Sequence, residues 1–495
     1  MLNFNTYFSK AHNTSSEYCA SIIKLDKISP IEGADNIGVV YVNFTPIIIR
    51  KDQFIEGEYY FYAPNESELC EKFLSANNLY DIQNYELNSN SNIVKKYISE
   101  GLYDAAQANC GFFNKYGRVR TIKLRGQQSF GFLFSLSELK TAFPDIDIDY
   151  IDPSWKNFEF DTIYGTQFIK PYIPRPKYTK LAKTKKEKDF KKEKGFDRLI
   201  PGQFSFHYDT KLFNKYIYQM NGDTEIVITP KIHGTSAIFG NILTKKPICL
   251  PIYKKILNQL VNWKFLCNKY YTDPFEKEYS LIYSSRKVIK NRILYKDSKY
   301  TNDIWGKFAQ IFSDQKIIDK DLIIYGEIVG WSSSTQLIQK QYDYGCKKGE
   351  AKFMPYRIVQ HTNTSTIEWE IDQVKEWTQK IKAIIPNMIM EIPILYKGTL
   401  RNLCSNISNE NWYKLDDQIY QNILNSISSN ISVLGMEKNE PLCKNKVPRE
   451  GICIRILNDP IPECFKLKTE KFRKYELKLI DSGESNIEMM ENNKI

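Results

Sequence analysis

Short runs of β-branched and aromatic residues, separated by turn residues, fill much of the first third of the chain. Gly33, Gly57 and Pro64 separate several of these runs. Closely spaced runs of this kind predict the strands of a small barrel or sandwich, interrupted by a helical or irregular stretch over residues 66–110. The predicted strands are ASIIKLDKISPI (20–31), GVVYVNF (38–44), PIIIRKDQF (46–54), EYYFYAP (58–64), RVRTIKLRG (118–126) and SFGFLFSL (129–136).

From about residue 200 the pattern changes, and strand-like runs alternate with stretches of helical period. The runs EIVI and DLIIYGEIVGW predict strands, whereas NDIWGKFAQIF and DQVKEWTQKIKAI have helical spacing. Strand-like runs continue with KFMPYRIVQ, REGICIRIL and ECFKLK. The mixture predicts an α+β region with substantial antiparallel sheet.

A strongly basic segment joins the two regions. Residues 175–194 contain nine lysines, one arginine and three acidic residues. Such a run is either a solvated tether or a phosphate-attracting arm. The boundaries predicted from these patterns are a β-rich region at 1–173, a linker at 174–200, an α+β region at 201–480 and a polar tail at 481–495.

Composition narrows the class of protein. The chain has 495 residues, of which 42% are hydrophobic and 14% aromatic, so it can bury sizeable cores. No apolar run reaches membrane-spanning length, and the N-terminus lacks the pattern of a secretory signal, so we expect no membrane association and an intracellular, reducing location. Ten cysteines without a CxxC pair and only four histidines argue against structural zinc. The net charge of +11 suits a polyanionic partner, although a lysine-rich composition alone also produces it.

Candidate chemistry begins at TPKIHGTS (229–236), which follows the run EIVI. Taken alone, Lys231 is best interpreted as a surface lysine beside a turn. Five later segments change that interpretation, because each carries a basic, acidic or aromatic residue at or near a predicted strand: SSRK (284–287), IIYGEIVG (323–330), KFMPYRIV (352–359), REGICIRI (449–456) and CFKLK (464–468).

These residue types suit nucleotidyl transfer. Two lysines and an arginine neutralise a triphosphate and lower the pKa of a nearby nucleophilic lysine. Lys466 and Lys468 are two apart on a predicted strand, so both ammonium groups share one face. An aromatic side chain stacks on a base, and a carboxylate holds a ribose hydroxyl or a divalent cation.

In this order, the segments resemble the motifs of the covalent nucleotidyltransferases, which comprise ATP-dependent polynucleotide ligases and mRNA-capping enzymes. The His-Gly-Thr form of the first motif resembles RNA ligases that seal nicks. Upstream, SIIKLDKISPIEGADNIGVVYV, RVRTIKLRGQQSFGFLF and IPGQFSFHYDT are similar to RNA ligases of the Deinococcus–Naegleria type, which carry an OB-fold module before the ligase domain. The resemblance covers roughly residues 18–140 and 200–475.

The resemblance implies a role for each matching residue. Lys231 would be the adenylylated nucleophile and Tyr356 would stack on adenine, with Phe353 as the alternative. Of the remaining residues, Glu327 would bind the ribose and contribute to the metal site, Glu450 would position the metal, Arg286 would contact the nucleotide or a 5′-phosphate, Lys466 and Lys468 would contact phosphates, and Ile232 and Gly234 would lie beside the nucleotide.

The implied fold is α+β. An N-terminal OB-like β-barrel with insertions would bind nucleic acid, and an ATP-grasp-like nucleotidyltransferase domain with antiparallel sheets would follow. Lys123 and Arg125, on one predicted strand face, are candidate phosphate contacts, with a merely solvated strand face as the alternative.

The implied activity is an ATP-dependent RNA ligase that uses Mg²⁺ or Mn²⁺ and joins a 3′-hydroxyl to a 5′-phosphate through lysyl-AMP, in RNA repair and as a monomer. The alternatives are a DNA ligase, an mRNA-capping guanylyltransferase, or a non-catalytic RNA-binding protein with a ligase fold. Two features depart from the family pattern. Pro230 precedes the lysine where many relatives have an acidic residue, and the segment 241–281 is longer than a minimal ligase needs.

Overall fold

The computed structural model describes residues 6–11, 16–173, 195–262, 272–294, 303–361, 365–408, 411–412, 416–457 and 463–482. The chain divides into two compact units. The N-terminal unit consists of residues 1–174 with 211–220 and 415–421, and the C-terminal unit contains the rest. Residues 174–194 of the predicted basic linker (174–200) and residues 483–495 of the predicted polar tail (481–495) lie outside the described residues. The domain boundaries drawn from the sequence stay predictions.

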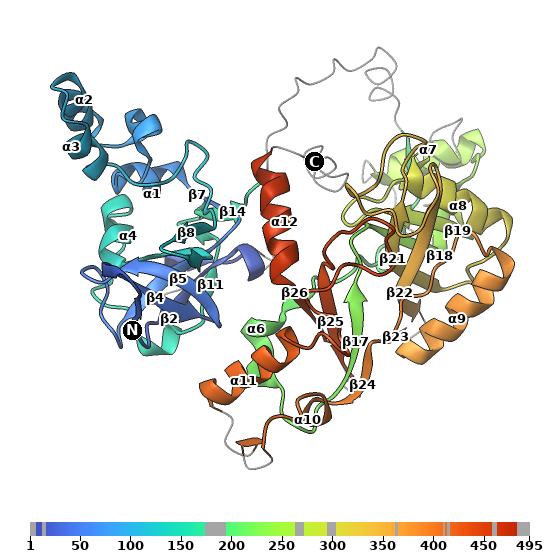
Figure 1. Cartoon of the computed structure of the whole chain (residues 1–495). Helices are drawn as coiled ribbons and strands as arrows, with labels where there is room; N and C mark the ends of the chain where they lie inside the picture. Colours follow the sequence, from blue (N-terminus) through green and yellow to red (C-terminus); the bar gives the residue numbers. More distant parts are fainter. Residues whose placement is uncertain are drawn as a thin grey trace. The chain divides into compact units, whose positions relative to one another are not determined.

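The N-terminal unit is built from short antiparallel strands with small helices between them (Figure 1). Its sheets have the strand orders β10-β6-β2-β11, β3-β4-β5, β1-β12-β13, β14-β7 and β8-β9. Within the described residues these sheets do not join into a closed barrel. Its elements are β1 (Phe8–Ser9), η2 (Ser16–Tyr18), β2 (Ala20–Lys24), β3 (Ser29–Ile31), β4 (Ala34–Val42), β5 (Thr45–Arg50), β6 (Tyr59–Pro64), β7 (Ser67–Leu69), α1 (Glu71–Ala76), η3 (Ile82–Leu87), α2 (Ser91–Ser99), α3 (Tyr103–Ala108), β8 (Ile122–Leu124), β9 (Gln127–Ser129), β10 (Gly131–Phe134), α4 (Leu136–Ala142), η4 (Pro153–Trp155), β11 (Glu159–Phe160), β12 (Thr162–Ile163), β13 (Thr166–Gln167), β14 (Ile169–Pro171), β16 (Lys211–Leu212), α6 (Phe213–Tyr216) and η5 (Ile217–Gln219).

Aromatic side chains fill the core of this unit. Phe61 of β6 stacks on Phe134 of β10 with ring centroids 5.3 Å apart, and Phe73 of α1 packs against the same ring. All three are fully buried. Burying rings of this size is the main apolar contribution to the stability of the unit. The aromatic-rich runs of the sequence therefore form its strands, as expected.

One predicted strand is shorter than the sequence suggested. The run 118–126 forms a strand only at β8 (Ile122–Leu124), and Arg125 lies in the turn that follows, with a φ of 48°. Near the start of the run, Arg118 is buried and pairs with Glu66 at 3.0 Å. The expectation that Lys123 and Arg125 share a strand face is therefore wrong, because the chain turns at Arg125.

Within the described residues, the C-terminal unit contains two large antiparallel sheets, named A and B here, and the two-stranded sheet β15-β20. Sheet A has the strand order β19-β18-β21-β22-β23, and sheet B is defined by the order β26-β25-β17-β24 within this unit. The predicted α+β class with antiparallel sheets is confirmed. Its elements are β15 (Phe196–Asp197), β17 (Glu225–Lys231), β18 (Thr235–Pro247), α7 (Ile252–Asn262), β19 (Phe275–Ser284), β20 (Ile293–Leu294), α8 (Ile304–Asp314), β21 (Leu322–Gly330), β22 (Ala351–His361), β23 (Thr366–Glu368), α9 (Ile371–Ile384), β24 (Tyr396–Thr399), α10 (Leu400–Leu403), α11 (Asp417–Ser428, which starts in the N-terminal unit's share of the chain), β25 (Gly451–Ile456), β26 (Cys464–Lys468) and α12 (Glu470–Asp481).

The two faces of sheet A have different environments. One face packs Phe239 and Phe353 against Phe308 and Phe312 of α8. The other face carries Tyr325 and several isoleucines. Strand β21 is buried at every position except Glu327, which is partly exposed. Because side chains alternate along a strand, Glu327 lies on the face of Tyr325 and away from the helices.

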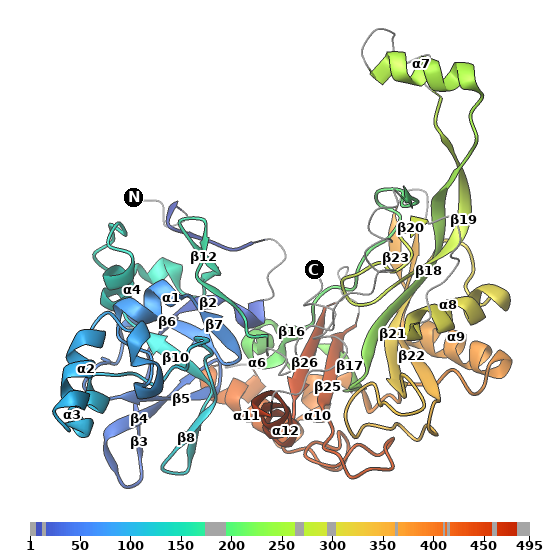
Figure 2. The same cartoon turned by 90° about the horizontal axis from the view of Figure 1, so that it is seen from above.

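The segment 241–281 forms an arm. Strands β18 and β19 pair from Ile238 with Ser284 out to Pro247 with Phe275. Helix α7 follows at the end of this hairpin, as Figure 2 shows. The extra length noted in the sequence is therefore a strand extension that carries a helix.

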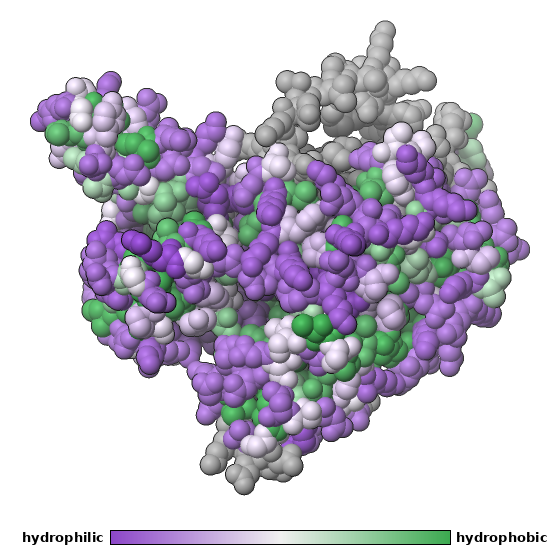
Figure 3. All heavy atoms as spheres, in the orientation of Figure 1, coloured by the Kyte–Doolittle hydropathy of each residue, from purple (hydrophilic) through white to green (hydrophobic). Residues whose placement is uncertain are grey.

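Hydrophilic residues dominate the face drawn in Figure 3, with hydrophobic residues in small patches among them. None of the described helices has the length and apolar character that crossing a membrane requires.

Candidate active site

Lys231 is the last residue of β17 and lies at the start of a tight loop. Its strand pairs with β25, with Lys231 opposite Gly451. The loop leads directly into β18 of sheet A at Thr235. One three-residue connection, 232–234, thus joins the two sheets directly after Lys231.

Two hydrogen bonds and one close approach fix this loop. The hydroxyl of Tyr344 accepts from the backbone N–H of His233 at 2.7 Å, and Gln339 donates to the Gly234 carbonyl at 2.6 Å. A Cβ at Gly234 would lie 2.6 Å from the carbonyl oxygen of Ile328. Only glycine therefore lets the loop pass this close to β21.

Pro230 is accommodated by the local strand pairing. It is opposite Ile452 of β25, whereas β24 pairs with β17 only from Glu225 to Ile228. Proline has no backbone N–H and is tolerated where one side of a strand is unpaired. Pro230, which the sequence left unexplained, thus lies where β17 pairs with β25 on one side but no longer with β24 on the other.

The ammonium of Lys231 is held by a buried carboxylate. Its Nζ lies 2.7 Å from Glu450 Oε1, and the Lys231 side chain is 25% exposed while that of Glu450 is 5% exposed. Burial alone would lower the pKa of Lys231, but the Glu450 carboxylate raises it well above its usual value. Likewise, burial alone would raise the pKa of Glu450, but Lys231 and then His233 hold it well below its usual value.

Both groups are therefore charged in this state, and Lys231 is not a free amine. The sequence had suggested that neighbouring cations lower the pKa of this lysine, and the structure gives the opposite direction. The reason is that the dominant charge beside Lys231 is a carboxylate and not another cation.

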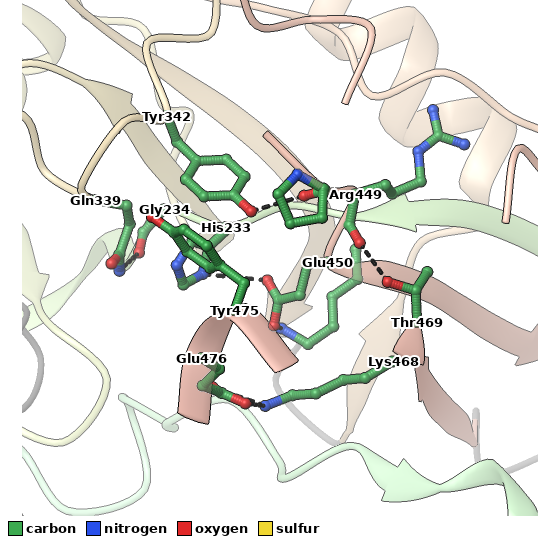
Figure 4. Close-up of polar contacts among 12 residues, drawn as sticks. His233, Gly234, Gln339, Tyr342, Arg449, Glu450, Lys468, Thr469, Tyr475 and Glu476 are labelled. Carbon is green, nitrogen blue, oxygen red and sulfur yellow. Dashed lines mark hydrogen bonds and ion pairs between the residues drawn. The ribbon is translucent and has the colours of Figure 1, made fainter. Parts of the chain in front are cut away.

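The second carboxylate oxygen of Glu450, Oε2, lacks a well-placed hydrogen-bond donor among the described residues. Oε2 is buried and accepts no well-aligned hydrogen bond from the described residues, although His233 Nδ1 lies 3.3 Å away. The His233 ring packs edge-on against Tyr342 and Phe472, with centroids 4.8 and 4.9 Å apart. Figure 4 shows His233 pointing toward Glu450. A buried carboxylate oxygen without a good donor suits a hard divalent cation.

Lys466 and Lys468 lie on strand β26, which pairs with β25 on the side away from β17. Lys468 is opposite Gly451, which is itself opposite Lys231, so the three form one row across sheet B. Lys466 is opposite Cys453 and is 8% exposed. Because the two lysines are two apart on a strand, they share the face of Lys231. The predicted cation pair thus lies on the same face of sheet B as the predicted nucleophile, with β25 between the two strands.

Sheet A supplies Glu327 and Tyr356. Glu327 is opposite Ser236, and its charge contributes to the raised pKa of Lys231. The pairing of β21 with β22 shifts register after Tyr325, which leaves Tyr356 as the extra residue of a bulge. Burial and then Glu327 raise the pKa of the Tyr356 hydroxyl well above its usual value. A bulge re-aims a side chain, and here the residue concerned lies near Glu327.

The alternative aromatic, Phe353, lies elsewhere. It is completely buried, and its ring contacts Phe239, Phe308 and Phe312 in the core beneath α8. It is opposite Ile328, on the face of sheet A that is turned away from Glu327. The geometry therefore favours Tyr356 over Phe353.

Arg286 lies just beyond the end of β19. Its guanidinium pairs with Asp209 at 2.8 Å, and both side chains are well exposed. It is close enough to affect the pKa of both Tyr356 and His207. Among the predicted residues of the C-terminal unit, Arg286 therefore belongs to the same electrostatic neighbourhood as Tyr356.

Sequence reasoning missed the contribution of the segment 203–209. The His207 ring packs against Tyr356 and Tyr325, with centroids 5.1 and 5.6 Å apart. Burial, followed by the charges of Arg357 and Arg455, lowers the pKa of His207 well below its usual value. The segment IPGQFSFHYDT had been noted only as a junction, and nothing in its pattern announces a contact with Tyr356.

No group of three or more histidine, cysteine, aspartate or glutamate side chains gathers as a metal site within the described ranges. Two carboxylates, Glu450 and Glu327, are the groups that fit a divalent cation. Mg²⁺ is commonly held by one or two carboxylates together with substrate phosphates, and a set of two carboxylates agrees with that preference.

The C-terminal unit carries a recognisable family signature. The sequence model of the RNA ligase family matches residues 224–472, which is half of the chain and includes every predicted site residue of the C-terminal unit but not the segment 203–209. This protein belongs to the RNA ligase family.

Among solved structures, the chain is similar to RNA ligases from Naegleria gruberi. One, a variant with ATP and Mn, has 17% identity and a TM-score of 0.49, and the match covers 92% of this chain and 99% of that one. A second variant, with AMP and Mn, has 16% identity and a TM-score of 0.48, covering 94% and 98%. The ligase with PPi has 15% identity and a TM-score of 0.48, covering 93% and 98%. By sequence, no curated protein matches the chain.

Proposed function

We propose that this protein is an ATP-dependent RNA ligase of the Deinococcus–Naegleria type that forms a covalent lysyl-AMP at Lys231 and joins a 3′-hydroxyl to a 5′-phosphate. The observation that carries the proposal is the buried Lys231–Glu450 pair at the end of β17, in one row with Lys468. Glu327 and Tyr356 on sheet A supply the carboxylate and the aromatic ring that a bound nucleoside needs.

In the first step the Lys231 ammonium loses a proton to solvent, and the free Nζ amine attacks the α-phosphorus of ATP. A P–N bond forms, and the P–O bond to pyrophosphate breaks. In the second step an oxygen of the RNA 5′-phosphate attacks the same phosphorus, so the P–N bond breaks and the lysine is restored. In the third step the 3′-hydroxyl attacks the activated 5′-phosphate and AMP leaves.

Each residue has a defined task in this scheme. Lys466 and Lys468 offset the charge of the triphosphate and of departing pyrophosphate. Glu450 keeps Lys231 protonated at rest, and any ligand that engages Glu450 removes the partner that holds the proton on Lys231. A Mg²⁺ or Mn²⁺ ion held by Glu450 would neutralise phosphate charge as a Lewis acid. Tyr356 stacks on the base, and Glu327 holds the ribose.

The N-terminal unit is proposed as the RNA-binding module. Lys123 and Arg125 lie on the β8–β9 hairpin, are exposed, and form no ion pair with the described residues. Solvated cations of this kind attract a phosphate backbone without reading its sequence. Monomeric action in a reducing compartment completes the proposal.

The test is sealing of defined nicked duplexes. The substrates are all-RNA, all-DNA and hybrid nicks, each with ATP or GTP and with Mg²⁺ or Mn²⁺. We expect ATP-dependent sealing of RNA 3′-hydroxyl ends that is lost in Lys231→Ala. Lys397→Ala is the matched control, because Lys397 is also ion-paired, with Asp372 at 2.6 Å, but lies on β24. Equal sealing of DNA 3′-hydroxyl ends would favour a DNA ligase, and a GTP requirement would favour a capping enzyme.

A further inference from the structure

Lys468 already has a carboxylate partner. Its Nζ lies 2.9 and 2.8 Å from the two oxygens of Glu476, which belongs to helix α12. Figure 4 shows this pair beside Glu450. The side chains of Lys468 and Glu476 are 20% and 35% exposed, so the contact is at the edge of the site and not in a core. A residue proposed to bind phosphate is therefore engaged by a carboxylate in this state.

Helix α12 presents Glu476 from a fixed position. The Thr469 hydroxyl donates to the Arg449 carbonyl at 2.7 Å, and it also accepts from the backbone N–H of Phe472 in the first turn. Phe472 is completely buried and packs on His233. One turn further on, Tyr475 donates to the Lys340 carbonyl at 2.9 Å.

Spacing along the helix then determines where Glu476 points. Phe472 and Glu476 are four residues apart, so they lie on the same side of α12. Phe472 faces the loop that follows Lys231, and the Lys468 ammonium lies 5.6 Å from its ring centroid. Helix α12 therefore directs the Glu476 carboxylate toward the row of sheet B that contains Lys231, Gly451 and Lys468.

We propose that Glu476 is a positioning residue that holds Lys468 away from the nucleotide phosphates, and that Lys468 exchanges this carboxylate for phosphate when the nucleotide binds. Glu476 occupies two of the three N–H donors of the Lys468 ammonium, and its negative charge repels an approaching phosphate. Binding must therefore break the Lys468–Glu476 pair. The inference rests on the proposed function, because it requires that Lys468 contacts phosphate.

The exchange makes a directional prediction. Glu476→Gln keeps the size and polarity of the side chain but removes its charge. Nucleotide then no longer competes with a carboxylate for Lys468, so binding becomes tighter. Partly exposed ion pairs contribute modestly, so we expect a gain of about two- to five-fold in affinity. A residue that merely supported Lys468 would produce the reverse sign.

The experiment measures pyrophosphate binding to the full-length, unadenylylated protein by calorimetry in the presence of Mg²⁺. The KM for ATP in lysyl-AMP formation is measured in parallel. We expect Glu476→Gln to lower both the dissociation constant and the KM, with a smaller change in kcat, and Glu476→Asp to remain closer to the unmodified protein. In a Lys468→Ala background the same Glu476 change should have no effect, because the pair no longer exists.

Glu470→Gln is the matched control on the same helix. Glu470 also pairs with a lysine, Lys474, at 2.6 Å, but both side chains are more than half exposed. Unchanged or weaker pyrophosphate binding in Glu476→Gln, or an equal gain in Glu470→Gln, would overturn the inference. If instead the unmodified protein forms no ATP adduct and binds no pyrophosphate, it is the proposed function that fails.

Discussion

The candidate functional cations of the two units lie in different environments. In the N-terminal unit, Lys123 and Arg125 lie on a short exposed hairpin without ion-pair partners among the described residues. In the C-terminal unit, Lys231 and Lys468 are each held by a carboxylate within 3 Å. A cation that only attracts a polyanion needs solvent exposure, whereas a cation that takes part in chemistry needs a defined position and a defined protonation state.

Removing the Glu450 carboxylate, which pairs with Lys231, should produce the largest effect on activity. Glu450→Ala leaves Lys231 without its partner and removes the carboxylate proposed to hold the metal. We expect lysyl-AMP formation to fall by about 10²–10³-fold, the usual loss when a positioned charge is removed from a reacting centre. Rates are measured with labelled ATP. Asp372→Asn, which breaks the exposed Lys397 pair, is the control and should leave the rate unchanged.

The loop after the lysine offers a second way to disturb the C-terminal site. Gly234→Ala would bring a Cβ to 2.6 Å from the Ile328 carbonyl, which is backbone and cannot easily move. We expect a loss of about 1–3 kcal/mol in the free energy of unfolding, together with reduced adduct formation. Denaturant titration measures the first quantity. A fully stable Gly234→Ala protein would show that the loop is less confined than the geometry indicates.

In the N-terminal unit, charge removal should act through salt dependence. Replacing Lys123 and Arg125 together with glutamine should weaken RNA binding by a few-fold at low salt. It should also reduce the slope of log affinity against log salt concentration by about 1.4–1.8, the change expected when two phosphate contacts are lost. Arg50→Gln is the control, because Arg50 is exposed but already pairs with Asp52 at 2.7 Å. An unchanged slope in the double variant would remove this hairpin from the RNA surface.

A smaller effect is expected from His207, which the structure places against Tyr356. Its pKa in the folded protein is well below the unfolded value of about 6.5. The unfolded chain therefore takes up a proton that the folded protein does not, and stability is lost as the pH falls below about 6.5. His207→Gln should reduce the dependence of the unfolding midpoint on pH between pH 7 and pH 5.5. An equally steep dependence in the variant would assign the effect to other groups.

The candidate residues of the C-terminal site were easier to predict from the sequence than their ion pairs and protonation states. The order of the motifs singled out Lys231, Glu327, Glu450, Lys466 and Lys468 as candidates. Strand register explains why Lys231 and Lys468 lie in one row of sheet B. The choice between Tyr356 and Phe353 needed the bulge after Tyr325, because alternation alone does not reveal a register shift.

Other features had no sequence signal at all. The direction of the Lys231 pKa depends on which charge lies closest in space, and Glu450 is more than two hundred residues away along the chain. Glu476 looks like any surface glutamate of an amphipathic helix until α12 is packed against the loop. In the N-terminal unit, the turn at Arg125 broke a strand that composition alone would have continued.

The proposed ligase activity depends most on Lys231 being the residue that receives AMP. The direct measurement is to incubate the full-length protein with ATP and Mg²⁺ or Mn²⁺, digest it, and locate the added AMP by mass spectrometry. We predict the modification on the peptide that contains Lys231 and its complete absence from Lys231→Ala. AMP on a different residue, or an adduct that persists in Lys231→Ala, would contradict the account.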